Sequence, residues 1–165
     1  MTATLEAPPA AFPREPLSEY ELERGKGLPT MNHALIQARL ICAFSLSDKY
    51  EAASELSLDL GTGAPAVPDI SLLPRTNIDL WNDEARATEP PVSVVEIVSP
   101  TQSSSEMVKK VHAYLAHGVQ TCWLVDPPLH QITVFHADGT KKIFDEGLVT
   151  DPVTGITADL ALIFA

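Results

Sequence analysis

An apolar segment of Val and Ile, residues 92–98, constrains the fold of this chain more than any other part of the sequence. Such a run is typical of a central strand that is covered on both faces of a sheet. The run nevertheless contains Glu96. Because a carboxylate buried there without a partner costs several kcal/mol, the sequence predicts that something stabilises Glu96.

Two other residues are candidates for such a site. Asp69 lies in a second apolar run, residues 67–73, and Lys110 follows on a predicted helix. Two carboxylates about 4 Å apart repel by roughly 4 kcal/mol at an effective dielectric near 20, whereas a hard cation such as Mg²⁺ or Mn²⁺ coordinates both. Asp69 and Glu96 are therefore candidate metal ligands, and Lys110 is a candidate for holding an anion beside the metal, as phosphodiester hydrolysis requires.

The alternative is that these three residues have no common role. Glu96 would then face solvent on an edge strand, Asp69 would lie in a turn after Pro68, and Lys110 would belong to an exposed helix face. The three residues by themselves leave this alternative open.

The periodicity of residues 104–117 predicts a helix that connects the central strand to the next strand, residues 121–125. Helical phase places Lys110 nearer the buried stripe than Lys109, which we expect to be solvated. Tyr114 borders the stripe, and we expect a core aromatic residue whose hydroxyl lies at the rim. The stripe itself comprises Met107, Val108, Val111 and Leu115.

The remaining pattern predicts an α/β domain with a mixed central sheet flanked by helices. Strict alternation over residues 55–60 favours a strand that forms a hairpin with the run containing Asp69. His33 falls in the first turn of a helix with Asn32 as its cap, where it either reaches the site or is an ordinary surface or hydrogen-bonded histidine. The other predicted elements are helices at 17–24 and 32–44, an irregular connection at 77–91, a strand at 131–135, and a short strand and tail after 142.

Length and composition indicate one domain, residues 18–165, since 165 residues with 45% hydrophobic content suffice for one core. Residues 1–17 contain four prolines and are expected to form a loosely ordered arm. The sequence shows neither a secretory signal nor an apolar run that spans a bilayer, so we expect a cytoplasmic protein. Cys42 and Cys122 are interpreted as buried thiols.

The net charge of −11 argues against tight binding of nucleic acid, because such affinity rests on Lys and Arg at phosphates. DNA binding is therefore expected to be weak and to depend on a local cluster, with Lys109, Lys110, Lys141 and Lys142 as its candidate members. The rival interpretation is a catalytically weak or inactive nuclease fold that acts as a protein-interaction module. A homodimer is a further candidate assembly that the sequence does not decide.

The chain also resembles a known family. One part of the sequence looks like the signature of the bacterial Uma-two family, which is assigned to the PD-(D/E)XK nuclease superfamily. The matching positions are residues 89–100, Lys110, Tyr114, Gly118–Val119 and residues 122–127. Pro68–Asp69 is similar to the Pro-Asp of that family. The resemblance extends upstream to Tyr20–Gly25 and to His33, and so covers about residues 18–165.

The resemblance implies a restriction-endonuclease-like fold and a magnesium-dependent endonuclease that hydrolyses DNA phosphodiesters. It implies that Asp69 and Glu96 bind the metal and that Glu21 is an accessory acid. It further implies that Lys110 replaces the lysine usually found two residues after the glutamate, a position that Val98 occupies here. Residues 101–105 are Thr, Gln and three Ser where relatives tend to carry arginines, so a phosphate-contacting patch is missing.

Overall fold

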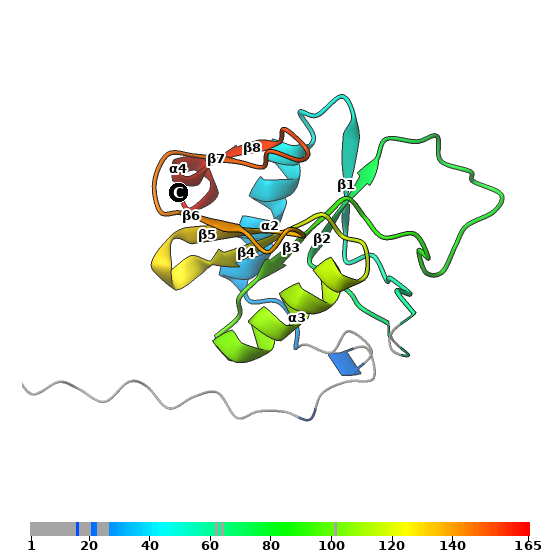
Figure 1. Cartoon of the computed structure of the whole chain (residues 1–165), viewed down its shortest axis with the longest axis horizontal. Helices are drawn as coiled ribbons and strands as arrows, with labels where there is room; N and C mark the ends of the chain where they lie inside the picture. The colour runs from blue at the N-terminus through cyan, green and yellow to red at the C-terminus, as the bar shows by residue number, and fades with distance from the viewer. Residues whose placement is uncertain (1–15, 17–20, 23–26, 62, 64, 101) are drawn as a thin grey trace, which may run out of the picture.

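The computed structural model describes residues 16, 21–22, 27–61, 63, 65–100 and 102–165, and its centre is a six-stranded mixed sheet (Figure 1). The strand order is β1-β2-β3-β4-β5-β6; β3 and β4 are parallel and all other neighbours are antiparallel. The predicted α/β class is therefore confirmed. The strands are β1 (Tyr50–Ser54), β2 (Ile70–Pro74), β3 (Ser93–Ile97), β4 (Thr121–Asp126), β5 (Gln131–His136) and β6 (Lys141–Phe144).

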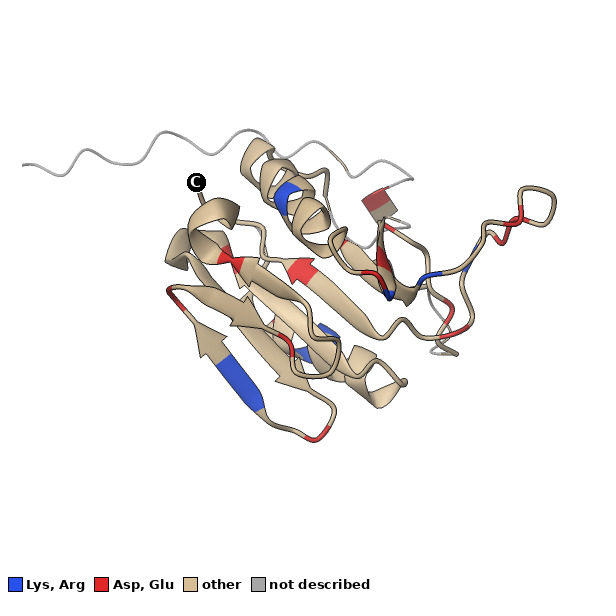
Figure 2. Ribbon diagram, turned by 90° about the horizontal axis from the view of Figure 1, so that it is seen from above, with Lys and Arg blue, Asp and Glu red and all other residues tan. Residues whose placement is uncertain are grey.

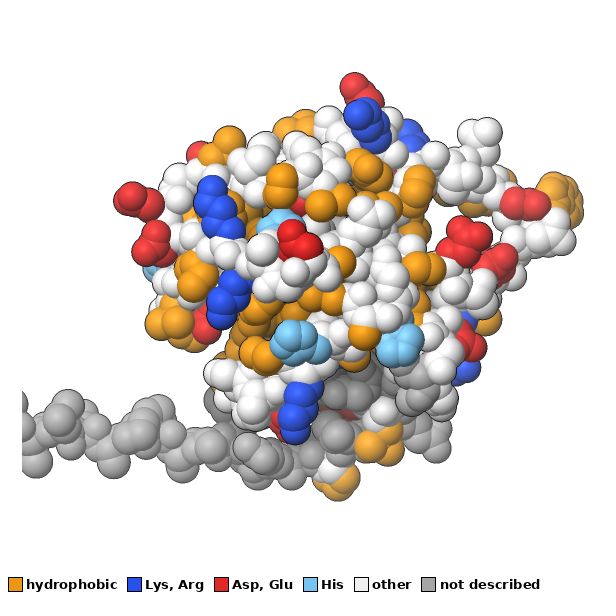
Figure 3. All heavy atoms as spheres, in the orientation of Figure 1, with side chains coloured by type: hydrophobic (Ala, Val, Ile, Leu, Met, Phe, Trp, Pro, Cys, Tyr) orange, Lys and Arg blue, Asp and Glu red, His pale blue; other side chains and the backbone are white. Residues whose placement is uncertain are grey.

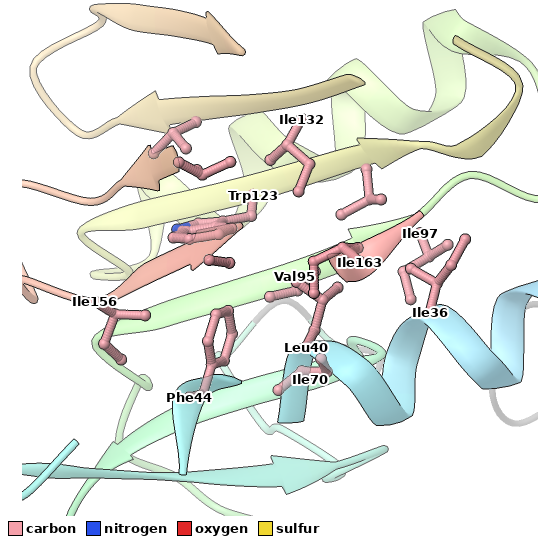
Figure 4. Packing of buried hydrophobic residues seen from close by; sticks show 14 of the residues in the cluster. Ile36, Leu40, Phe44, Ile70, Val95, Ile97, Trp123, Ile132, Ile156 and Ile163 are labelled. Atoms are coloured by element: carbon pink, nitrogen blue, oxygen red, sulfur yellow. The ribbon is translucent and has the colours of Figure 1, made fainter. Parts of the chain in front are cut away.

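Strand β3 lies inside the sheet, and all five of its residues are buried. Its side chains alternate between two apolar layers. Val95 and Ile97 belong to a cluster with helix α2 (Met31–Phe44), whose Leu40 and Phe44 point at the sheet in Figure 4. Val94 belongs to a second cluster on the opposite face, beneath helix α3 (Ser104–Ala116). Glu96 lies two residues after Val94 and therefore on the α3 side.

Helix α3 connects the parallel strands β3 and β4, as predicted. Its start is fixed by a capping box in which the Ser103 side chain accepts from the Glu106 amide and Glu106 accepts from the Ser103 amide. Gln102 accepts hydrogen bonds from the amide and hydroxyl of Ser99. Gln102 and Ser103 thus order the turn and the start of the helix that carries Lys110.

The C-terminal part packs against α2 and contains β7 (Leu148–Thr150), β8 (Thr157–Asp159) and α4 (Leu160–Ile163). Asp151 is fully buried, and its carboxylate links this part to the sheet through hydrogen bonds. Its Oδ2 lies 2.7 Å from the Thr121 hydroxyl and accepts a hydrogen bond from the Trp123 indole. Its Oδ1 accepts from the Val153 amide. The sequence analysis did not single out this carboxylate.

Several local predictions were wrong. The strand predicted over 55–60 is absent, because Glu55 adopts a left-handed backbone (φ 53°) and only Leu58 forms isolated bridges; β2 pairs instead with β1. Cys42 is exposed on α2, whereas Cys122 is buried as expected. The N-cap of α2 is Thr30 and not Asn32.

The predicted arm at 1–17 lies, except for Pro16, outside the described residues. Of the helix predicted over 17–24, the structure describes Glu21 and Leu22, and both are helical. No helix in the described part of the chain is long and apolar enough to cross a membrane.

Candidate active site

Asp69 and Glu96 lie next to each other across the β2–β3 ladder. Ile70 is paired with Val95, so one further step of the antiparallel register leads to Asp69 and Glu96. Directly opposite residues of such a pair have Cβ atoms about 4.5–5.5 Å apart. Both residues are fully buried. The antiparallel pairing of β2 with β3 thus brings together two carboxylates that are 27 positions apart in the sequence.

Lys110 and Tyr114 of α3 hold Glu96 from one side. The Lys110 ammonium lies 2.7 Å from Oε1 of Glu96, and the Tyr114 hydroxyl donates to the same oxygen at 2.7 Å. Residues four apart lie on one helix face, which explains how both reach one carboxylate. The Lys110 side chain is 29% exposed and is the part of this group that is open to solvent.

Asp69 is held by α2 and by the backbone of β3. His33 Nε2 lies 3.1 Å from Oδ1 of Asp69, and Oδ2 accepts a 2.7 Å hydrogen bond from the Ile97 amide. The Gln37 side chain donates a 2.7 Å hydrogen bond to the Asp69 carbonyl. His33 and Gln37 are four residues apart on α2, so the first turns of this helix fix both the side chain and the backbone of Asp69.

The surroundings of Glu96 change the acidity of its neighbours. Burial, followed by the negative charge of Glu96, raises the pKa of Tyr114 far above its ordinary value of 10, and the charge of Asp69 acts in the same direction. Burial and Glu96 also raise the pKa of the Cys122 thiol, while Lys110 opposes that shift. Tyr114 is therefore a permanent hydrogen-bond donor to Glu96.

The predicted position of Tyr114 was thus partly wrong. Its ring is in the core, but the hydroxyl is buried against Glu96 and does not reach the rim. Val108, predicted to belong to the buried stripe, is 37% exposed, because the buried face of α3 is centred on Met107, Val111 and Tyr114 and Val108 lies at its margin.

Glu21, the accessory acid that the resemblance implies, accepts a hydrogen bond from the Leu28 amide at 3.0 Å, a short distance before the start of α2. Among the described residues, no set of three His, Cys, Asp or Glu side chains converges as a complete metal cage. Asp69 and Glu96 are the two carboxylates that lie side by side.

The basic residues do not form the predicted cluster. Lys141 and Lys142 lie on β6, which β4 and β5 separate from β3. They extend over different rings, Phe135 and Phe144 respectively. In Figure 2 the basic residues are scattered over separate elements, and on the face shown in Figure 3 they are also apart from one another.

Sequence reasoning missed Gln37, because its partner is a backbone carbonyl that no residue pattern reveals. It left the role of His33 open between a site residue and an ordinary histidine. The buried contact with Asp69 now places His33 beside the carboxylates. The one available signal was that His33 and Gln37 share a helix face with Ile36 and Leu40.

Comparisons with known proteins bear on the fold and the family of this chain. A solved structure with the description "putative nuclease belonging to DUF820", from Anabaena variabilis ATCC 29413, superposes with a TM-score of 0.72 and 26% sequence identity. The match covers 83% of this chain and 82% of that one. Among curated proteins, none matches this sequence. A family model with the description "Putative restriction endonuclease" matches residues 10–162, and the chain accordingly belongs to the Uma2 family.

Proposed function

We propose that this protein is a metal-dependent endonuclease that hydrolyses phosphodiester bonds of DNA. The observation that carries the proposal is the contact of Lys110 with Glu96, beside Asp69, in a member of this family. These are the residue types that an electrostatic site for phosphoryl transfer needs: two oxygen donors for a hard cation and one ammonium for an anion.

The donor set fits Mg²⁺ or Mn²⁺. Mg²⁺ is commonly bound through one or two carboxylates, with water and substrate phosphate at its other positions, so a full protein cage is not required. Asp69 and Glu96 would hold the ion from adjacent strands, and Glu21 is an additional candidate donor. Bound there, the ion would polarise the phosphate and lower the pKa of a water molecule.

The protein groups have separate tasks in this proposal. Lys110 would stabilise the charge that develops on the phosphate during attack by water. Tyr114 would fix the orientation of Glu96, and His33, together with the Ile97 amide, would fix that of Asp69. Such fixed partners keep catalytic carboxylates in one geometry before the substrate arrives.

A nicking assay tests the proposal. Supercoiled plasmid is incubated with the protein and Mg²⁺ or Mn²⁺, beside Asp69→Asn and Glu96→Gln variants that preserve side-chain size. We expect the wild type to convert plasmid to the nicked form only with metal, and both variants to lose at least about 100-fold in rate. Equal nicking by wild type and variants would indicate a contaminating nuclease and contradict the assignment.

A second candidate function is protein interaction without catalysis. It is favoured by the net charge of −11 and by the loop between β2 and β3, where Ile78, Leu80 and Trp81 are 79%, 84% and 94% exposed. Figure 3 shows apolar side chains at the tip of this projecting loop. Failure of metal-dependent nicking at any metal concentration would favour this second candidate.

A further inference from the structure

A cavity lies on the α2 side of the sheet, near the ends of β3 and β4 and next to the first turn of α2, which carries His33. Its volume is about 170 Å³, and its polar lining comes from Asn32 and Arg39 of α2 and from His130. Leu35 and Phe164 contribute to its apolar wall. No step of the proposed hydrolysis uses any of these residues.

The position of the cavity follows from the topology. Glu96 is paired with Leu124 on β4, and Pro127, which lines the cavity, follows three residues later. Three residues of a strand span about 10 Å. Asn32 is adjacent to His33, which contacts Asp69. The cavity therefore lies at the same end of the strands as the carboxylates, on the α2 side of the sheet from which His33 reaches Asp69, about three nucleotides of duplex away at about 3.4 Å per nucleotide.

Arg39 is held in place at this cavity. Its Nη1 donates to the backbone oxygens of Ile163 and Ala165 at 3.0 and 2.6 Å, and Ala165 itself lines the cavity. A guanidinium carries five N–H donors in a planar fork that matches the oxygens of a phosphate. The two backbone oxygens thus orient the Arg39 guanidinium. They also occupy the N–H groups of Nη1.

His130 has an unusual backbone. It is in the left-handed region, with φ 49° and ψ 42°, and its ring stacks on Phe164 at 5.3 Å between centroids. Non-glycine residues in this region carry strain, and such positions concentrate at functional sites. Asp145 and Glu146 line a second cavity that shares His130 and Phe164 with this one, and their charges make that second cavity unfavourable for an anion.

We propose that Arg39, His130 and Asn32 form a subsite for an internal DNA phosphate about three nucleotides from the scissile bond. The inference rests on the proposed function for the identity of the substrate. A basic fork, an imidazole and an amide around an apolar wall suit a phosphate with its sugar. In a chain of net charge −11, such a subsite supplies a local phosphate contact that the overall charge does not.

The test is the affinity for a short fluorescent duplex without terminal phosphates, measured with Ca²⁺ over a range of salt concentrations. Arg39→Gln is compared with Arg75→Gln, a control whose side chain donates to the Ser47 carbonyl beyond the far end of β2. We expect Arg39→Gln to weaken binding about five- to tenfold at low salt and to reduce the salt slope by about 0.9. Arg75→Gln should stay within about twofold of the wild type.

Because Arg39 also holds the C-terminal residues, His130→Asn provides a second variant. Asn tolerates the left-handed backbone and removes the imidazole. It should weaken binding about two- to fivefold, as loss of one hydrogen bond predicts, with an unchanged melting temperature. Binding of thymidine 5′-monophosphate, followed by the NMR signals of His130, provides a further test. This mononucleotide should bind far more weakly than the duplex. Equal affinity would identify a mononucleotide pocket and overturn the assignment to an internal phosphate.

The outcomes separate this inference from the function on which it rests. Equal effects of Arg39→Gln and Arg75→Gln, or full duplex affinity in His130→Asn, would overturn the subsite, whether or not the wild type nicks plasmid. Absence of nicking together with duplex binding that depends on Arg39 would overturn the nuclease and leave the subsite standing. A wild type that does not bind duplex under any condition would overturn the subsite.

Discussion

The Tyr114 hydroxyl donates a 2.7 Å hydrogen bond to Oε1 of Glu96, the same oxygen that lies 2.7 Å from the Lys110 ammonium. One helix therefore supplies both partners of a carboxylate that lies in the middle of the sheet. This arrangement accounts for a glutamate within a strand of Val and Ile, because the charge has a cation and a buried donor beside it.

The Tyr114 contact gives a prediction about alkaline stability. Tyr114→Phe removes a hydrogen bond to a charged group and should lower the free energy of unfolding at neutral pH by about 1.5–3 kcal/mol. The folded-state pKa of Tyr114 is raised above its ordinary value of 10, so the stabilisation is complete below pH 10. It declines as the pH rises further, because the unfolded chain then ionises this tyrosine.

Chemical denaturation of wild type and Tyr114→Phe at neutral pH and at about pH 11 measures the effect. The difference between the two proteins should be constant up to about pH 10 and shrink above it. A difference that grows with alkaline pH would show that Tyr114 ionises more easily in the folded protein, and would contradict the buried contact with Glu96.

The two adjacent lysines of α3 should differ in their effect on catalysis. Lys110→Ala removes the ammonium at Glu96 and should reduce turnover by at least about 100-fold. Lys109 is exposed. The pKa of Glu106 is lowered mainly by hydrogen bonds from Ser103, and the charge of Lys109 has a smaller effect on it. Lys109→Ala should therefore alter turnover by less than about threefold. Plasmid nicking rates compare the two variants, and equal losses would disprove the assignment of Lys110.

Asp151 should matter for stability and not for chemistry. In Asp151→Asn, one carboxylate oxygen becomes an amide group that faces the donors of Thr121, Trp123 or Val153. The expected cost is about 2 kcal/mol, or about 4–8 °C in melting temperature. Metal affinity and nicking rate below the melting transition should equal those of the wild type. Loss of metal binding without loss of stability would place Asp151 in the functional site.

The scattered basic residues predict weak association with DNA. With two to four phosphate contacts, the logarithm of duplex affinity should fall with the logarithm of salt concentration at a slope of about −2 to −4. Titrations of a duplex in Ca²⁺ at several salt concentrations give this slope. Tight binding with a slope steeper than about −6 would reveal a basic surface that the described residues do not present.

The main features of the fold could be predicted because they rest on periodicity. The largely apolar run of β3 and the apolar stripe of α3 identify a central strand and a crossover helix, and the structure confirms both. The strand prediction for residues 55–60 was wrong, because an alternation of apolar and polar residues indicates which side chains are buried and not whether the backbone pairs with another strand. Leu58 is buried, but the left-handed backbone of Glu55 ends β1 before that residue.

The residues of the candidate site could be predicted only where a charged residue interrupts a segment that the sequence predicts to be buried. Glu96 stands out because it interrupts an apolar strand, and helical phase favoured Lys110 over Lys109, in agreement with the observed contact. Gln37 and Asp151 carry no such signal, because their partners are distant in sequence and include backbone groups. A single sequence does not encode these pairings in any readable local pattern.

The most direct test of the central claim is calorimetry of Mn²⁺ binding to the intact chain. We predict one ion per chain in the wild type, loss of at least about tenfold in affinity for both Glu96→Gln and Asp69→Asn, and unchanged binding in the Asp151→Asn control. Thermal unfolding of each variant verifies that it is folded. Wild-type affinity in a folded Glu96→Gln protein would contradict the account.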